Sequence, residues 1–188
     1  GAYPTSSHEW TGSSWTAGGS LPSPKNYGSA IAGTQTAAFS AGGAYPQKNT
    51  TSNYDGSSWT TSGNLPTNTY NTMGNSVGGQ TTGVATGGNA TSFPSFAPEV
   101  YHYNGSVWSQ DVAAPAPYTN TGASFGPQSA HVFAGGPAGA SQSASTVEYN
   151  ITAGTIVPAT WSSGGAIPGS GRQGYGVGTG TQTASIIA

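Results

Sequence analysis

The side chains able to do acid–base or metal chemistry are few in this chain. It holds three Lys or Arg, five Asp or Glu, three His and no Cys. The lack of Cys excludes disulfides and thiolate metal sites. The strongest remaining chemistry is a three-histidine metal site, which would need His8, His102 and His131 to converge.

The positions of these residues argue against a catalytic centre. The three His fall at different positions of the repeat described below, so they cannot form a symmetric ring. Glu9 and Glu148 are equivalent residues of different repeats, and Glu99 and Asp111 are expected in loops. No nucleophile elbow, phosphate-binding loop or acid–base pair is found. We therefore expect strand-filling or surface His, no metal, no cofactor and no enzymatic activity.

The sequence that must position these residues contains an internal repeat. Four Trp each have a Pro seven residues later, and a polar turn with a Gln follows about twenty residues after each Trp. A Gly pair comes seven residues after each of the first three Gln. The Trp are Trp15, Trp59, Trp108 and Trp161, and the Gln are Gln35, Gln80, Gln128 and Gln182. The 188 residues therefore hold four repeats of about 47 residues.

The local signals within each repeat are those of β-strands. Asp55-Gly56 and Asn104-Gly105 lie between aromatic strand residues and predict type I′ hairpin turns. No segment shows a sustained helical period, and Gly and Pro are too frequent for long helices. Four short strands fit into each repeat. We expect an all-β propeller of four-stranded antiparallel blades, as a single domain over residues 1–188.

The order "AAFSAGG", Tyr54, Trp59, "LP" resembles the kelch repeat, and it returns through the whole chain. More narrowly, "YDGSSWT…LPT…GTQTA…GG" looks like the kelch-like repeats of predicted phage structural and tail-fibre proteins, especially marine ones. The resemblance implies a β-propeller whose N- and C-terminal strands share one blade, with "TASIIA" pairing against "GAYPTSSHEWTGSSWT". Four repeats imply a four-bladed ring or part of a larger ring, and a segment of a longer repeat protein stays open.

The enzymes of the kelch superfamily and other enzymatic propellers are excluded on their residues. Copper-radical oxidases that resemble galactose oxidase need a Cys cross-linked to a Tyr, and this chain has no Cys. Sialidases use an Arg cluster to clamp a carboxylate, and Arg172 is the single Arg of the chain.

The repeated aromatic residues are expected in the structural core, because every blade needs a large plate against its neighbour. They are Trp15, Trp59, Trp108, Trp161, Tyr54, Tyr103 and Tyr149, with Trp10 at the position of the three Tyr. Stacking of a carbohydrate on these residues is the alternative.

Residues that break the repeat are the better candidates for ligand or partner binding, because packing does not dictate them. Two long connections, "NATSFPSFAPEVYH" and "NITAGTIVPAT", interrupt the pattern, and extended loops on a rigid scaffold often bind. Tolerated insertions and contacts between subunits remain alternatives. The candidates are Phe93, Phe96, Asn150 and Ile156 in these connections, with the aromatic residues Tyr118 and Tyr175.

The composition argues against nucleic acid and a lipid bilayer as partners. Only 4% of residues are charged and the net charge is −2, which gives no basic face for nucleic acid. No apolar run is long enough to span a bilayer. We expect a non-enzymatic structural or attachment protein of a virus particle, such as a phage tail fibre, capsid decoration or adhesin. It would be in the virion or extracellular, with other virion subunits or a host-surface glycan as partners. A secreted carbohydrate-binding propeller lectin is the alternative.

Overall fold

The computed structural model describes residues 3–26, 28–43, 48–69, 73–74, 78–89, 97–116, 122–135, 137–138, 141–142, 144–150, 160–163, 178–181 and 184–187. Of residues 73–74, 137–138, 141–142, 160–163, 178–181 and 184–187, only the backbone is described. All statements below concern this part of the chain.

The described chain is all-β, and every strand pair is antiparallel. Three sheets have four strands each, and within each sheet the strands lie side by side in chain order. Sheet I consists of β3 (Ala30–Thr34), β4 (Ala37–Ala41), β5 (Thr51–Tyr54) and β6 (Trp59–Ser62). Sheet II consists of β7 (Met73–Gly74), β8 (Gly83–Thr86), β9 (Val100–Tyr103) and β10 (Trp108–Gln110). Sheet III consists of β11 (Gly122–Phe125), β12 (Ala130–Gly135), β15 (Thr146–Asn150) and β16 (Thr160–Ser163).

Three two-stranded sheets complete the fold. The N-terminal hairpin is β1 (His8–Trp10) with β2 (Trp15–Ala17), and the C-terminal hairpin is β17 (Gly178–Thr181) with β18 (Ala184–Ile187). A small pair, β13 (Pro137–Ala138) with β14 (Ser141–Gln142), lies between β12 and β15 in the sequence.

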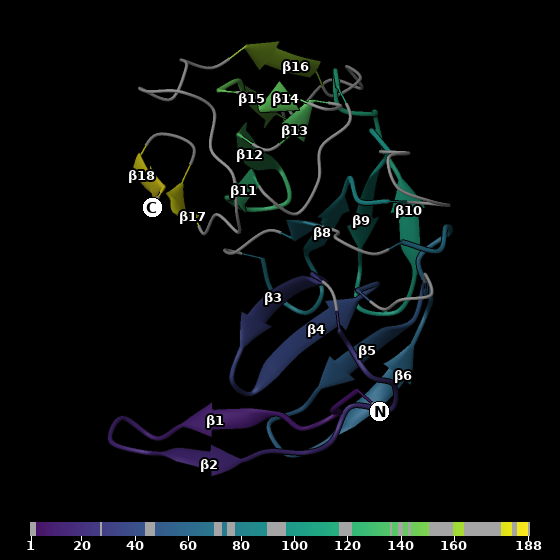
Figure 1. Ribbon diagram of the computed structural model, residues 1–188, viewed down its shortest axis with the longest axis vertical. Helices are drawn as coiled ribbons and strands as arrows, with labels where there is room; N and C mark the ends of the chain where they lie inside the picture. The colour runs from purple at the N-terminus through teal and green to yellow at the C-terminus, as the bar shows by residue number, and fades with distance from the viewer. Residues whose placement is uncertain are drawn as a thin grey trace.

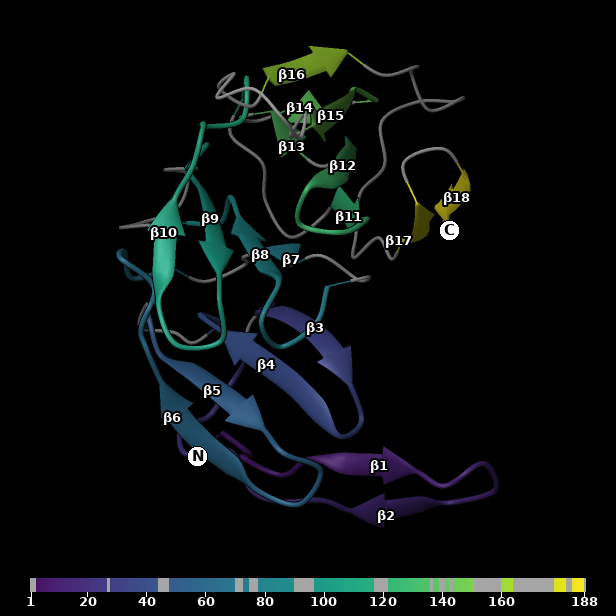
Figure 2. The same ribbon diagram turned by 180° about the vertical axis from the view of Figure 1, so that it is seen from behind.

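The sheets follow one another along an arc, from the N-terminal hairpin through sheets I, II and III to the C-terminal hairpin (Figures 1 and 2). Their first strands contact each other in turn: β3 contacts β7 and β8, β7 contacts β11, and β11 contacts β17. The first strands of the sheets thus line the inner side of the arc, as strands line the axis of a propeller. The propeller-like all-β arrangement expected from the repeat is confirmed.

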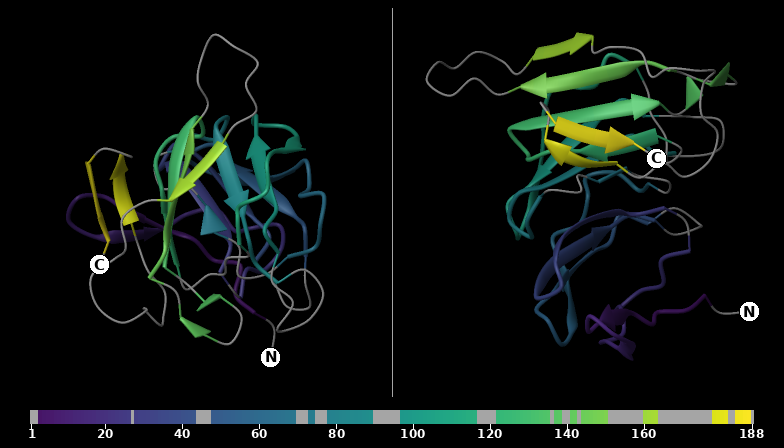
Figure 3. Two further views of the ribbon diagram at one scale, coloured as in Figure 1. Left: turned by 90° about the horizontal axis from the view of Figure 1, so that it is seen from above. Right: turned by 90° about the vertical axis from the view of Figure 1, so that its left-hand side faces the viewer.

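The two ends of the chain do not share a blade, contrary to our expectation. The N-terminal hairpin and the C-terminal hairpin form separate two-stranded sheets, and they are separated along the long axis of the molecule (Figure 1 and the right-hand view of Figure 3). The physical reason is that each hairpin packs on its neighbour in the sequence. Tyr54 of sheet I donates a hydrogen bond to Glu9 of β1, while β17 packs on β11.

The turns that join the outer strands differ from the expected type I′ turns. Tyr54 pairs with Trp59, so four residues, and not two, lie between the paired aromatics. Asp55 does not sit at the centre of the turn but caps it, because its Oδ1 accepts the N–H groups of Ser57 and Ser58 at 2.9 and 2.8 Å. Gly56 takes the positive φ of 96°. The Asn104 turn repeats this geometry.

The Gly pairs have a backbone reason that the sequence did not specify. Gly42 and Gly43 have φ of 66° and 78°, and Gly87 and Gly88 have 63° and 95°. Two successive residues with positive φ strongly favour Gly, because a Cβ is strained in that region. These pairs let the chain leave the second strand of each sheet and turn back toward the third.

The repeated Gln residues bind each sheet to the one before it. The Nε2 of Gln80 donates to the carbonyl oxygens of Ala38 and Tyr54 at 3.0 and 2.9 Å. The Nε2 of Gln128 donates in the same way to Gly83 and Tyr103, at 2.9 and 3.2 Å. Each Gln thus spans two neighbouring strands of the preceding sheet through one amide group.

We expect Gln128→Ala to lower the free energy of unfolding by about 1–3 kcal/mol, because two carbonyl oxygens in the junction lose their donor. Gln35→Ala is the matched control, since the hydrogen bonds of Gln35 are exposed and 3.4 Å long. Its effect should stay below about 0.5 kcal/mol. Urea unfolding of both variants measures the difference, and equal losses would contradict this account of the junction.

Candidate functional site

The candidate site develops from a contact that recurs where one sheet meets the next. A Tyr in the last two residues of the third strand of each sheet directs its hydroxyl at the preceding sheet. Tyr54 donates to Glu9 of the N-terminal hairpin, and Tyr103 donates to Asn53 Oδ1 of sheet I at 3.1 Å. Tyr103 also hydrogen-bonds Ser62. We call this contact the tyrosine latch.

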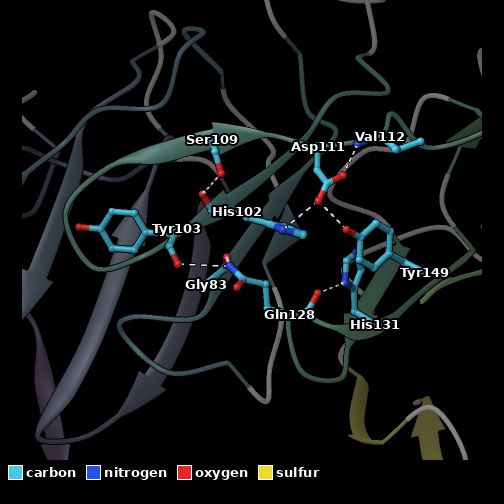
Figure 4. A network of polar contacts seen from close by, with 9 residues as sticks. All are labelled: Gly83, His102, Tyr103, Ser109, Asp111, Val112, Gln128, His131 and Tyr149. Carbon is cyan, nitrogen blue, oxygen red and sulfur yellow. Dashed lines mark hydrogen bonds and ion pairs between the residues drawn. The ribbon is translucent and has the colours of Figure 1, made fainter. Parts of the chain in front are cut away.

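The latch between sheets II and III carries ionisable groups. The hydroxyl of Tyr149 donates to Asp111 Oδ2 at 2.5 Å, and His102 Nδ1 lies 3.1 Å from the same oxygen. The other carboxylate oxygen of Asp111 accepts the N–H of Val112 at 2.6 Å. Figure 4 shows His102 and Tyr149 approaching Asp111 from the two sheets.

A second histidine enters this latch from sheet III. His131 is fully buried, and its ring stacks on Tyr149 with centroids 4.3 Å apart. It also lies edge-on to His102, at 5.9 Å between centroids. The Nδ1 of His131 lies 3.2 Å from the carbonyl oxygen of Gln128, which fixes the ring at the base of β12.

The strand register shows that packing alone does not require these residues. His131 pairs with Tyr149, whereas the residues opposite Tyr54 and Tyr103 are Ala38 and Gly83. A small residue is necessary at Gly83, because a Cβ there would lie 2.3 Å from the ring of Phe39. A bulky His at the corresponding position of sheet III is therefore a specific departure from the repeat.

Asp111 and His102 depart from the repeat in the same sense. They stand where sheet I has the uncharged pair Ser62 and Asn53, three residues after the Trp and one before the Tyr. Compared with the latch between sheets I and II, the third latch thus has a carboxylate and an imidazole in place of neutral groups, while the first latch also has a carboxylate acceptor, Glu9.

Burial keeps the rings of this cluster uncharged at neutral pH. Desolvation lowers the pKa of His131 to about 3, with His102 adding to the effect. Desolvation also lowers the pKa of His102, although Asp111 opposes this. Burial and the hydrogen bond to Asp111 raise the pKa of Tyr149, so its hydroxyl stays protonated and donates.

The groups of this cluster can bind and release protons, but they do not present a nucleophile. The Asp111 carboxylate orients His102, as in a catalytic dyad, but the hydroxyl nearest to them is bonded to the carboxylate itself. Within the described residues, no group of three or more His, Asp or Glu could hold a metal ion. The cluster is suited to holding two sheets together in a way that depends on proton concentration.

Lys25 is a further ionisable side chain partly withdrawn from solvent, beside sheet I. Its Nζ donates to the carbonyl oxygens of Gly42 and Thr50 at 2.8 Å each, and to Thr50 Oγ1 at 3.1 Å. Burial lowers the pKa of its amine to about 8. Since three oxygen acceptors surround the ammonium, its position favours a structural tie beside the first Gly pair.

The aromatic residues that we placed in the core differ in burial, and Trp59 is half-buried. Tyr54, Tyr103, Tyr149 and Trp108 are buried, with 4, 0, 0 and 9% of their surface exposed. Trp15 departs from the expectation, since it is 68% exposed, and Trp10 is 47% exposed. No described strand precedes this hairpin to cover them. The side chain of Trp161 is outside the described part.

The predicted binding residues are not brought together in the described structure. Phe93, Phe96, Tyr118, Ile156 and Tyr175 lie outside the described residues. Asn150 ends β15, where it pairs with Ala130 and Thr160.

His8 lies in β1, away from the cluster. Sequence reasoning treated His102, His131 and Asp111 as unrelated. The available signal was that the repeat has a small residue at the position of His131.

Comparison with known proteins supports the fold alone. No protein-family model and no curated protein matches the chain. The solved structure of YjhT matches 98% of the chain with a TM-score of 0.76 at 14% identity. The chain shares the kelch-type, propeller-like fold of YjhT.

YjhT is the larger of the two proteins, because the chain spans 65% of its length. The similarity shows no common activity at this identity. Among the described residues, no helix is long and apolar enough to cross a membrane.

We expect the free energy of unfolding to decrease as the pH falls from 6.5 to 4.5. The unfolded chain takes up a proton at His131 below its ordinary pKa of 6.5, whereas the folded chain resists until about 3. The contribution of His131 to the free energy of unfolding is therefore fully present above pH 6.5. Below that pH the free energy of unfolding falls by up to about 1.4 kcal/mol per pH unit because of this residue. Urea unfolding at several pH values measures it. His131→Ala, which restores the residue of sheet I, should flatten the slope, and an unchanged slope would contradict the assignment.

We also expect the uncharged latch of sheet I to function at the third junction. The double variant His102→Asn with Asp111→Ser should keep the free energy of unfolding within about 1 kcal/mol of the parent, because Tyr149 retains acceptors. Asp111→Ala alone should cost about 1–3 kcal/mol, since it leaves the Tyr149 hydroxyl without its carboxylate acceptor. Thermal unfolding of the three proteins at pH 7 makes the comparison. An equal loss in both variants would show that the charge itself is required.

Proposed function

We propose that the chain is a non-enzymatic structural and attachment module of a virus particle. The observation that carries the proposal is that the repeated polar side chains are used between the sheets. Gln80, Gln128, Tyr54, Tyr103 and Tyr149 each make a hydrogen bond to the preceding sheet, and Tyr103 also bonds Gly105 in its own turn. Such a molecule is built as a stiff scaffold.

The surface chemistry supports the same proposal. A chain with 4% charged residues and a net charge of −2 has little electrostatic repulsion to keep copies apart. An exposed pair of Trp on one hairpin adds apolar surface, which marks contact sites. These features suit a subunit whose surface is covered in an assembly. The resemblance of the repeats to those of phage structural proteins supports a virion as that assembly.

Proteomics of purified particles tests the proposal. Virus particles from the source of the gene should yield peptides of this chain in a fixed ratio to the known capsid subunits. Chymotrypsin is the suitable protease, because only three Lys or Arg are present and aromatic residues are 11% of the chain. Peptides found only in the unassembled cellular fraction would contradict the viral role.

A secreted lectin is the second candidate, and the exposed Trp10 and Trp15 favour it. Their ring centroids are 5.4 Å apart, and exposed aromatic faces suit stacking on a sugar ring. A glycan array with the purified chain should then give signals that Trp15→Ala removes. An array at background level would count against a lectin.

A further inference from the structure

The N-terminal hairpin exposes a face that the repeat normally covers. Trp10 and Trp15 pack against each other as a tilted ring pair, as Tyr54 and Trp59 do, with centroids 5.4 and 4.9 Å apart. The indole of Trp59 donates to Ser7 Oγ at 3.2 Å, and that of Trp108 donates to Thr51 Oγ1 at 2.9 Å. In each case the hydroxyl belongs to the preceding segment. The partner of Trp15 is therefore a sheet with a hydroxyl at the same position.

The C-terminal hairpin has the register of the first half of a sheet. Thr181 pairs with Ala184 and Gly180 with Ser185, as Thr34 pairs with Ala37 and Gly33 with Ala38 in sheet I. In sheet I the next strand, β5, pairs with β4. Among the described strands, none pairs with β18 at the corresponding edge.

The N-terminal hairpin has the register of the missing second half. Trp10 pairs with Trp15 across a four-residue turn, as Tyr54 pairs with Trp59 in β5 and β6. The edge of β1 that corresponds to the β4-facing edge of β5 has no partner strand in the described part. The two hairpins together thus have the strands of one four-stranded sheet.

We propose that the N-terminal hairpin of one copy adds to the C-terminal hairpin of a second copy and completes a four-stranded sheet between two chains. The register of β4 and β5 would place Trp10 opposite Ser185 and His8 opposite Ile187. Trp15 would then lie over sheet III of the second copy, where Thr146 occupies the position of Thr51. Main-chain pairing of edge strands supplies affinity, and the Trp supplies register.

A second copy fits better than the chain's own end. Within one chain three sheets lie between the two hairpins, which are separated along the long axis of the molecule (Figures 1 and 2). The contact is heterologous, which builds closed rings or filaments. It deepens the proposed structural role, on which its biological meaning rests.

Engineered disulfides test the joint, and the absence of native Cys makes the result easy to interpret. Two chains with different tags, one with His8→Cys and one with Ile187→Cys, are mixed and oxidised. We expect a disulfide-linked dimer that carries both tags. Thr179→Cys replaces Ile187→Cys in the matched control, because Thr179 is on β17 and away from the joining edge. Its yield should be at least about fivefold lower.

The double variant His8→Cys with Ile187→Cys separates the alternatives. Dimers and longer chains are expected on oxidation, whereas an internally linked monomer would mean that the chain closes on itself and would overturn the proposal. Cross-linking no better than the Thr179→Cys control would also overturn it. None of these results depends on finding the chain in a virus particle, so the joint and the viral role can fail separately.

Trp15→Ala tests the role of the exposed indole without disturbing the fold, since the side chain is 68% exposed. Light scattering should show self-association weakened about tenfold, with an unchanged circular dichroism spectrum. Self-association unaffected by Trp15→Ala would overturn the placement of Trp15. Binding of a glycan that needs Trp15, in a protein that stays monomeric, would overturn the joint in favour of a lectin.

Discussion

The junction between successive sheets is the constraint on which the rest of this structure depends. A four-stranded sheet of two- to six-residue strands buries little apolar surface by itself, so each sheet is stable only against its neighbours. The buried Tyr rings supply apolar area, while their hydroxyls and the Gln amides satisfy polar groups that the contact removes from water. Gly pairs, capped turns and small residues such as Gly83 follow from the need to bring sheets this close.

The cluster of His102, Asp111, Tyr149 and His131 shows how a repeat acquires an individual property. The geometry of the latch is retained, but a carboxylate and two imidazoles replace neutral or small residues. The junction of sheets I and II has no imidazole to titrate, whereas burial of His131 lowers its pKa and is expected to make this junction weaker at acidic pH. The difference lies in three side chains and needs no change in the course of the backbone.

The sequence predicted the repeat and the strand-rich fold, because Trp, Gln and Gly-Gly recur at fixed spacing and each has a local role. Burial of Tyr103 and Trp108 followed from the same spacing. The turn at Asp55 was assigned to the wrong type, because a side-chain cap competes with the backbone preference of Asp-Gly. The separation of the two hairpins could not be predicted, since it depends on the angle between sheets. The His102–Asp111 contact was missed because the strand register, which brings these residues together, cannot be read from a short stretch of sequence.

The Gln contacts have a consequence for how such a chain can change over generations. Gln80 and Gln128 bind carbonyl oxygens of the main chain, and every residue offers a carbonyl whatever its side chain. A repeat that contacts its neighbour in this way fits any other repeat whose backbone follows the same path. Duplication, loss or exchange of units by recombination would preserve the junction, so the number of units and their loops can diverge rapidly while the scaffold stays the same.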